Sequence, residues 1–449
     1  MSPAEGEGLV ARPNNSGPDA SGSVGRTATA WAPVLWVVGI VSAGLATVEA
    51  VHQATNRLQV DMAVYLMGGR HLLDGRLYLV SLPNPPHLPF TYPPFAALVF
   101  APLTVLPERT AQVLWSVVNV VALFALLWLS LRAARPGLPR DRRLLWSLIL
   151  MTPALWIEPV HLTLGFGQVN IVLAALVLAD LTGHLRVGRR SLPRGVLVGV
   201  VAAIKLIPLV FVPYLFLTRQ TRAAWAALGT FAGCSALAAA VNPGASWSYW
   251  TKYATDAKRV GGVFYISNQS LRAVVDRVDH RVVSTALVTV LSGLVLVAGV
   301  ALAAWACRSS SGFLGVLVCA TTGLLVSPIT WAHHMVWTVP VLIWLIWAPD
   351  RPGGGRLWAA AGAALFWWAP IWTVPNGGNR ELAEHGWQLL RGNSFFLASV
   401  VFEIGVAAML WARARRGREA PGGGGAADEA AVGPTVTKGA RSPSDPAAH

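Results

Sequence analysis

Long apolar runs separated by short basic loops constrain this chain more than any other feature of its sequence. The longer runs hold about 20 residues each, which is the length that a helix needs to cross a hydrocarbon core roughly 30 Å thick. Only 12% of the residues are charged and 54% are hydrophobic, whereas soluble domains carry about 25% charged residues. The sequence therefore predicts an all-α polytopic membrane protein with about 10–12 transmembrane helices and extracytoplasmic loops.

Most of the apolar runs are expected to cross the membrane, but the run at residues 94–106 is short for a crossing. A run of this length is better suited to a re-entrant or interfacial helix. The expected crossings are residues 31–51, 111–132, 144–157, 168–184, 195–217, 223–241, 283–306, 313–330, 334–348, 357–373 and 394–412.

Clusters of arginine decide the expected topology. Segments 132–143 and 185–194 are rich in arginine, and Arg219 and Arg222 form a third cluster. The positive-inside rule places all three clusters in the cytoplasm. This arrangement requires that the short run does not cross, and that segment 195–217 returns to the side on which it began.

Segment 195–217 contains the sequence AAIKLIP, in which Lys205 lies near the middle and Pro208 follows. We expect a helical hairpin that is broken near Lys205, because this lets both ends of the segment face the cytoplasm. Charged and broken helices at membrane depth are tolerated only where they face protein or a watery cavity. Both chain ends are then cytoplasmic, and the expected outer regions are residues 52–93, 158–167, 242–282 and 374–393.

The two ends of the chain are rich in small and polar residues. We expect disordered cytoplasmic tails at 1–29 and 413–449, around a transmembrane domain at 30–412. The net charge of +14 comes from arginines in the loops and tails. That pattern is typical of contact with membrane lipids, so nucleic acid is not an expected partner.

No motif in the sequence indicates a cofactor. There is no glycine-rich nucleotide loop, and His333 and His334 are adjacent rather than separated by the helical turn that a metal-binding pair needs. We therefore expect neither a cofactor nor a metal ion.

Four polar residues near the outer side can carry chemistry or structure. Asp61 opens a helix-like stretch, where it is either an N-cap or a general base at the membrane surface. Tyr92, in the rigid turn FTYPP, either lies at the lipid interface or contacts a ligand. Gln168 and Asn170, at the outer end of a crossing, either hydrogen-bond other helices or hold a sugar or phosphate.

Lys205 is the most informative single charge in the sequence. A lysine at the centre of a crossing costs about 2.5–3.5 kcal/mol on insertion scales, and no acidic residue is near it in the sequence. Its partner is therefore either an anionic ligand such as phosphate, or an acid on another helix such as Glu158, Asp180 or Glu403.

Two motifs further along the chain complete the set of candidate residues. The sequence SNQSLR supplies Asn268, Gln269 and Arg272, whose side chains can hold hydroxyl groups or phosphate. The sequence SPITWAHH supplies His333 and His334, which are either interfacial residues or donors to a phosphate or a leaving group.

In this order, the first-loop aspartate and the motifs FTYPP, GQVN, AAIKLIP, NQSLR and SPITWAHH resemble glycosyltransferase family 87 of the GT-C superfamily. The resemblance covers roughly residues 35–412. It implies an inverting transfer from a polyprenyl-phosphate sugar to a glycolipid or lipoglycan of the cell envelope, at the outer face of the plasma membrane. It also implies that Asp61 is the base, and that His333 or His334 is the family's site histidine.

The resemblance favours a hexosyltransferase, most specifically a polyprenyl-phosphomannose-dependent α-1,2-mannosyltransferase. The alternative within the family is an arabinofuranosyltransferase that uses decaprenyl-phosphoarabinose. A transporter or lipid flippase is the alternative from a different class, because an intramembrane lysine in a broken helix suits it too. For the transferase, the lipid-linked sugar is an activated substrate, and no nucleotide is required.

Overall fold

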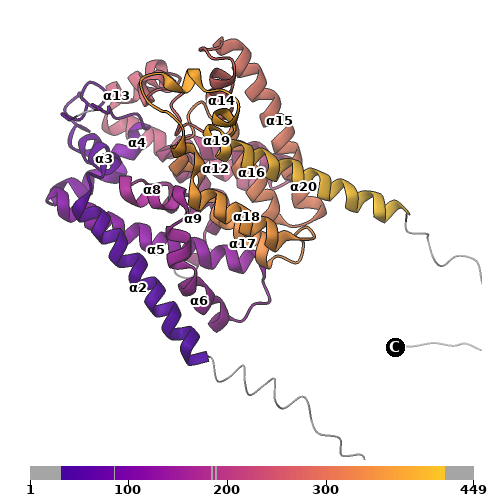
Figure 1. Ribbon diagram of the computed structural model, residues 1–449. Helices are drawn as coiled ribbons and strands as arrows, with labels where there is room; N and C mark the ends of the chain where they lie inside the picture. Colours follow the sequence, from indigo (N-terminus) through magenta and orange to yellow (C-terminus); the bar gives the residue numbers. More distant parts are fainter. Residues whose placement is uncertain (1–31, 85, 184–185, 188–189, 420–449) are drawn as a thin grey trace, which may run out of the picture.

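The computed structural model describes residues 32–84, 86–183, 186–187 and 190–419 as a bundle of helices (Figure 1). Within these residues the only strands are β1 (Arg186–Val187) and β2 (Arg190–Ser191), which pair in antiparallel orientation. The predicted all-α polytopic architecture is confirmed. The expected tail at 1–29 lies outside the described residues, as does the expected tail from residue 420 onward.

The N-terminal half of the chain packs around one long helix, α5 (Glu108–Ala134). Its other elements are α2 (Ala32–Asn56), α3 (Val60–Arg70), α4 (Pro94–Phe100), η1 (Ala101–Val105), α6 (Arg140–Ile149), α7 (Met151–Leu155), α8 (Glu158–Phe166), α9 (Asn170–Thr182), α10 (Val196–Ile204), η2 (Ile207–Val210), α11 (Phe211–Leu217) and α12 (Thr221–Val241). Helices α2 and α9 both pack against α5, and α10 packs against both α9 and α12.

The C-terminal half packs around α16 (Gly312–Val326), which contacts both α15 and α20. Its other elements are α13 (Pro243–Ser248), η3 (Tyr249–Tyr253), η4 (Ala257–Val260), α14 (Leu271–Val278), α15 (Thr285–Ser309), η5 (Ala332–Trp337), α17 (Thr338–Trp347), α18 (Gly355–Trp368), η6 (Pro370–Thr373), η7 (Arg380–Ala383), α19 (Trp387–Gly392) and α20 (Ser394–Glu419). Helix α20 continues past residue 412, where the transmembrane domain was expected to end.

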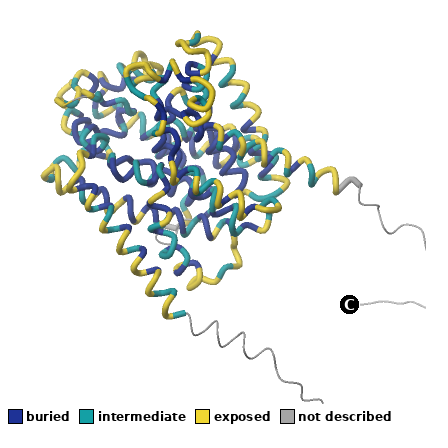
Figure 2. Tube along the Cα trace, viewed as in Figure 1, coloured by how far each residue is buried: buried dark blue, intermediate teal, exposed yellow. Residues whose placement is uncertain are grey.

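Five helices, α2, α5, α12, α15 and α20, are each long and apolar enough to cross a membrane. Their outward faces carry exposed apolar side chains, such as Ile40 on α2 and Val297 on α15, which are 62% and 71% exposed. Figure 2 shows exposed residues along the outer sides of these helices and buried residues at the centre of the bundle. Apolar faces of this extent indicate surfaces that lipid covers. The chain is a multi-pass membrane protein.

Several of the other expected crossings are interrupted. The expected crossing 144–157 is divided between α6 and α7, and 168–184 is α9, which is bent by 118° from α8. The expected crossing 334–348 is divided between η5 and α17. Apolar runs locate the hydrophobic segments, but the breaks within them follow from contacts that form only in the folded bundle.

The predicted broken hairpin at 195–217 is confirmed. Helix α10 ends at Ile204, Lys205 is extended with φ −151° and ψ 125°, and η2 starts a new segment that leads into α11. A guanidinium nitrogen of Arg194 donates a hydrogen bond to Oε1 of Gln220 at 2.8 Å, so the two ends of the hairpin lie together. The segment therefore returns to the side on which it began.

The short apolar run at 94–106 folds as α4 followed by η1. Together they pack against α3, α10 and α12. The run is among the apolar helices that are too short to cross alone, which agrees with the expected re-entrant or interfacial helix.

Short segments gather at one end of the bundle. In Figure 1, α3, α13, α14 and α19 lie at the upper end, whereas α6 and the start of α2 lie at the lower end. A hydrogen bond from Nδ2 of Asn242 to the carbonyl of Leu72 joins the start of α13 to the loop after α3 at 2.6 Å. Segments 52–93 and 242–282, which were expected to face outward and are far apart in the sequence, thus form one layer.

The close packing of α10 on α12 can be tested by a substitution at Gly199. A Cβ atom at Gly199 would lie 2.4 Å from the carbonyl oxygen of Ala227, so the helices would have to separate. We expect Gly199→Ala to destabilise the protein by about 1–3 kcal/mol, measured as thermal unfolding of the detergent-purified protein. Gly229→Ala on α12 is the control, because no atom lies within 4 Å of its Cβ position. Equal unfolding temperatures for the two variants would contradict this account of the packing.

Candidate active site

Helix α3 places Asp61 beside Gln168, in the turn between α8 and α9. The helix begins at Val60, with Gln59 at its N-cap position and Asp61 in its first turn. The N-cap interpretation of Asp61 is therefore wrong. The amide of Gln59 donates hydrogen bonds to Oγ of Ser116 and to the carbonyl of Leu164, at 2.9 and 3.0 Å. These bonds fasten the start of α3 to α5 and α8.

The turn between α8 and α9 brings Gln168 next to α3. Gly167 has φ +67°, and a Cβ there would lie 2.7 Å from Cβ of Met62 on α3. Glycine is required because only it combines this backbone conformation with so close an approach. Trp115 donates a hydrogen bond to the carbonyl of Gly167 at 2.9 Å, which fixes the turn from α5.

Two tyrosines and Gln168 form a hydrogen-bonded group beside Asp61. The hydroxyl of Tyr65 donates to Oε1 of Gln168 at 2.8 Å, and Nε2 of Gln168 donates to the hydroxyl of Tyr92 at 3.1 Å. The two tyrosine hydroxyls are 3.2 Å apart. Stacking of Tyr65 on Phe100, with ring centroids 4.2 Å apart, holds the group against α4.

Lys205 lies at the break in the hairpin and joins this group to the histidines. Its ammonium donates to Oδ1 of Asn170 at 2.8 Å and lies 2.9 Å from Nε2 of His334. Since an ammonium group only donates hydrogen bonds, His334 accepts through Nε2. The ammonium also lies 5.7 Å from the centre of the Tyr92 ring, a cation–π distance.

The two adjacent histidines have different surroundings. Both are buried, and η5 carries them into contact with α8 and α9. The backbone carbonyl of His333 accepts a hydrogen bond from Nδ2 of Asn170 at 2.9 Å. Its imidazole packs edge-on against Phe166, and neither ring nitrogen has a hydrogen-bond partner among the described residues. His334 is thus held by Lys205, while the ring of His333 keeps its hydrogen-bonding groups unused.

The charge that faces Lys205 comes from Asp61. The two side chains attract each other electrostatically. The three acids considered as partners from the sequence are bound elsewhere in the described structure: Glu158 to Trp372, Asp180 to the backbone at Gly195 and Val198, and Glu403 to Thr322.

Burial dominates the electrostatics of Asp61. It raises the pKa of Asp61 to about 6, although a hydrogen bond with Gln168 and the positive charge of Lys205 act in the opposite direction. A carboxylate with this pKa is ionised at pH 7 and is a stronger base than an exposed aspartate. A proton acceptor and a cation are therefore brought together from α3 and the hairpin.

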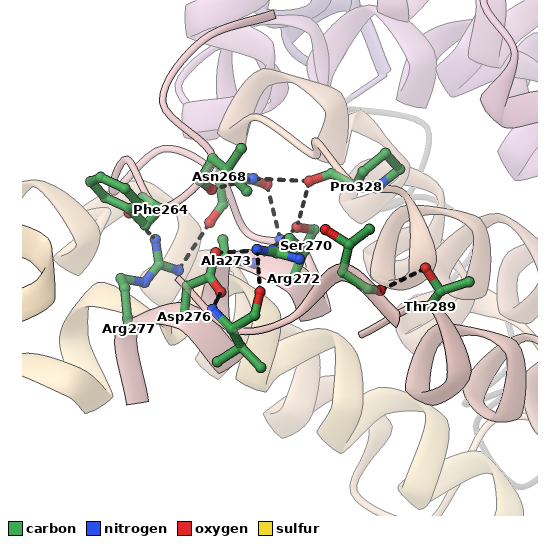
Figure 3. Close-up of polar contacts among 12 residues, drawn as sticks. Phe264, Asn268, Ser270, Arg272, Ala273, Asp276, Arg277, Thr289 and Pro328 are labelled. Atoms are coloured by element: carbon green, nitrogen blue, oxygen red, sulfur yellow. Dashed lines mark hydrogen bonds and ion pairs between the residues drawn. The ribbon is translucent and has the colours of Figure 1, made fainter. Parts of the chain in front are cut away.

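Residues of the SNQSLR motif make hydrogen bonds within the protein, several of which Figure 3 shows. Oδ1 of Asn268 accepts from the backbone N–H of Thr330 at 2.8 Å, and its Nδ2 donates to the carbonyls of Val263 and Pro328. These bonds fix the segment that leads into the two histidines. Asn268 is fully buried, and its amide is occupied by the protein's own backbone.

Gln269 and Arg272 are likewise bound to the protein itself. Nε2 of Gln269 donates to the carbonyls of Ile266 and Gly392, at 2.8 and 2.7 Å. Arg272 pairs with Asp276 at 3.0 Å and donates to the carbonyl of Val283. The structure brings Asp61, Tyr92, Gln168, Asn170, Lys205, His333 and His334 together, whereas Asn268, Gln269 and Arg272 stabilise the loops above them.

Two residues of this region were not singled out from the sequence. Tyr65 lies one helical turn after Asp61, and that spacing on a helix could have indicated a shared face. Arg277 is fully buried and donates to Oδ1 of Asn393 and to the carbonyls of Phe264 and Asn268. No local pattern distinguishes it from Arg272, because its partners come from distant segments.

Comparison with known proteins gives one consistent result. The sequence model described as "Glycosyltransferase family 87" matches residues 90–328. A "polyprenol-phosphate-mannose-dependent alpha-(1-2)-phosphatidylinositol mannoside mannosyltransferase" of Mycobacterium tuberculosis is 33% identical over 383 residues, which are 81% of this chain and 87% of the relative.

A second relative comes from Mycolicibacterium smegmatis. It is named "polyprenol-phosphate-mannose-dependent alpha-(1-2)-phosphatidylinositol pentamannoside mannosyltransferase". It is 36% identical over 358 residues, which are 75% of this chain and 79% of the relative. No solved structure matches the chain significantly.

The raised pKa of Asp61 makes a testable prediction about stability. An acid whose pKa is raised by folding stabilises the folded state at low pH, and this contribution is lost as the pH rises through about 6. We therefore expect Asp61→Asn to raise the unfolding temperature at pH 7 by about 2 °C or more, with a smaller difference at low pH. The exposed Asp256→Asn is the control and should change nothing. A lower unfolding temperature for Asp61→Asn at pH 7 would refute this.

Proposed function

The chain belongs to glycosyltransferase family 87, and from this premise we propose that it transfers mannose from a polyprenyl-phosphate donor to a phosphatidylinositol mannoside acceptor. The relatives' names describe that donor and that class of acceptor. The observation that carries the proposal is that the Asp61 carboxylate interacts electrostatically with Lys205, whose ammonium lies 2.9 Å from Nε2 of His334. The transfer requires a proton acceptor at one point and a cation for a phosphate at another.

Asp61 acts as the general base in this proposal. It takes the proton of the acceptor hydroxyl as the hydroxyl oxygen forms a bond to the anomeric carbon of mannose. In the same step the bond between the anomeric carbon and the phosphate oxygen breaks. A single displacement of this kind inverts the anomeric centre, and the second product is the polyprenyl phosphate.

Lys205 stabilises the phosphate as it leaves, and His334 holds the ammonium in position by accepting its hydrogen bond through Nε2. Charge-assisted hydrogen bonds from an ammonium are strong in a buried site, where water does not screen them. Asn170 holds both the Lys205 ammonium and the carbonyl of His333, at 2.8 and 2.9 Å, so it sets the position of the cation relative to the histidines. Tyr92, whose ring centre lies 5.7 Å from the Lys205 ammonium, and Gln168, which donates to the Tyr92 hydroxyl, would contact the sugar.

We place this reaction on the outer face of the plasma membrane, with both chain ends in the cytoplasm. The arginine-rich segment 132–143 leads into α6, which lies at the opposite end of the bundle from α3 in Figure 1. If the arginines are cytoplasmic, α3 and the loops around Asp61 face outward. A lipid-linked donor can reach such a site from the bilayer. Lipoglycans are further acceptors that this position would allow.

Removal of the Asp61 carboxylate tests the proposal directly. We expect Asp61→Asn to reduce transfer of radiolabelled mannose from polyprenyl-phosphomannose to phosphatidylinositol mannosides by about 10²–10⁴-fold. Asp256→Asn should transfer at the wild-type rate in the same membranes.

The other outcomes separate the alternatives. Equal transfer by wild type and Asp61→Asn would place the base elsewhere. Transfer only from decaprenyl-phosphoarabinose would make the protein an arabinofuranosyltransferase. Folded wild-type protein that transfers neither sugar would contradict the proposal and favour a transporter or flippase.

The pH dependence gives a second test. A base must be deprotonated, so kcat/KM should rise with pH and level off above about pH 6, following the raised pKa of Asp61. The positive charge of Lys205 lowers the pKa of Asp61, so Lys205→Met should move this rise to higher pH as well as slowing the reaction. A rise at the same pH in both proteins would show that another group titrates.

A further inference from the structure

A buried arginine and a buried glutamate lie together in the loops around α14 and α19. Arg277 on α14 and Glu384, which follows η7, are 0% and 1% exposed. The guanidinium of Arg277 donates five hydrogen bonds, which equals the number of its N–H groups. The acceptors are Oδ1 of Asn393, which receives two of the bonds, and the carbonyls of Phe264, Tyr265 and Asn268. Arg277 therefore has no N–H group left for a further acceptor.

Glu384 is left without a hydrogen-bond donor. It attracts Arg277 electrostatically, but neither oxygen of its carboxylate has a hydrogen-bond partner among the described residues. Gly392 approaches so closely that a Cβ atom there would lie 2.5 Å from Oε2 of Glu384, so the protein itself encloses the group. An uncompensated buried charge is costly. The enclosed carboxyl group is therefore favoured in its neutral, protonated form.

The hydrogen bonds of Arg277 reach the candidate active site through the loop that contains Asn268. This loop runs beside the segment that precedes the two histidines. The N–H of Gln269 donates to the carbonyl of Thr330 at 2.7 Å, and Oδ1 of Asn268 accepts from the N–H of Thr330 at 2.8 Å. His334 follows Thr330 by four positions. A displacement of Arg277 therefore acts on the segment that positions the histidines.

We propose that Arg277, its five hydrogen bonds and Glu384 form a proton-controlled clasp. With a proton on Glu384, the N–H groups of Arg277 stay on Asn393 and on the loop that contains Asn268. Without the proton, the carboxylate competes for these N–H groups, because a hydrogen bond between two charged groups is about twice as strong as a neutral one. The loop is then released, and the segment before the histidines loses its support.

The surroundings of Glu384 set the pH at which the clasp opens. Burial raises the pKa of Glu384 to about 7, although the positive charge of Arg277 acts in the opposite direction, and the negative charge of Glu381 raises the pKa further. Because folding raises this pKa, the proton stabilises the folded state at low pH, and that contribution is lost as the pH rises through about 7. On the outer side proposed above, the clasp would respond to the pH outside the cell.

The other charged groups on or next to α14, η7 and α19 are already bound or exposed. The remaining acids have donors: Glu381 has the N–H of Gly377, Asp276 has Arg272, and Asp279 has Arg281. Four basic side chains are exposed, namely His280, Arg380, His385 and Arg391. Glu384 is therefore the acid of this group whose ionisation requires a donor from elsewhere.

Hydrogen exchange of the purified wild-type protein tests the clasp without a substrate. Exchange is measured at pH 6 and at pH 8.5, and the rates are corrected for the intrinsic effect of pH. We expect the protection of residues 265–272 and 328–334 to fall by about tenfold at pH 8.5, with no change in α5. Unchanged protection of the two segments, or an equal loss in α5, would overturn the inference.

Two variants identify the titrating group. Glu384→Gln keeps the size of the side chain and cannot ionise, so both segments should stay protected at pH 8.5. Glu381→Gln removes a charge that raises the pKa of Glu384, so the loss of protection should move to lower pH. A loss at the wild-type pH in either variant would overturn the inference. The wild-type protein and Glu381→Gln keep the test decisive if Glu384→Gln does not fold.

The clasp also predicts a change on the alkaline side of the activity profile. Transfer by the wild type should fall by about tenfold between pH 7 and pH 8.5, which would end the plateau that Asp61 sets. Glu384→Gln should keep this plateau, whereas the control Asp256→Asn should fall as the wild type does. An equal fall in Glu384→Gln would overturn the clasp and leave the role of Asp61 intact. Wild-type protein that transfers no sugar would overturn the proposed function, while the exchange result would still decide the clasp.

Discussion

The half-buried ammonium group of Lys205 organises the candidate site of this protein. Lysine at membrane depth costs about 2.5–3.5 kcal/mol on insertion scales, so the surrounding segments must supply acceptors and an opposite charge. Asn170 and His334 supply the acceptors, and Asp61 supplies the charge. Each contributing segment is short, bent or broken near this point, as in the 118° bend between α8 and α9. Exposed backbone groups at this depth are tolerated only where protein encloses them, so the interruptions and the charged site require each other.

Hydrogen bonds among the loops at this end of the bundle hold the arrangement in place. Asn268 holds the segment before the histidines, and Arg277 holds the loop that contains Asn268 through its carbonyl at 2.9 Å. Asn393, at the start of α20, accepts two hydrogen bonds from the guanidinium of Arg277. The loops that contain Asn268 and Thr330 and the start of α20 are thereby held together. A polar network of this kind positions the histidines without contributing a group to the reaction.

Local sequence patterns predicted the parts of this site that depend only on residues close together in the chain. The charge of Lys205, the proline after it and the arginines around the segment were sufficient to predict the hairpin and its break. The approach of Asp61 to Lys205 was not predictable, because it depends on how α3 docks against the turn at Gly167. Arg277 was missed for the same reason, since its acceptor Asn393 is 116 positions away in the chain. Helix breaks inside apolar runs also depend on such contacts.

Lys205 has two roles that affect each other. Its positive charge lowers the pKa of Asp61 in the absence of substrate, and in the proposed reaction it also faces the phosphate of the donor. A bound phosphate would offset the charge of Lys205, and the proton affinity of Asp61 would rise. The carboxylate would then be a stronger base when the donor is in place than when it is absent. A site in which one cation faces both the base and the leaving group thus links donor binding to the activation of the acceptor.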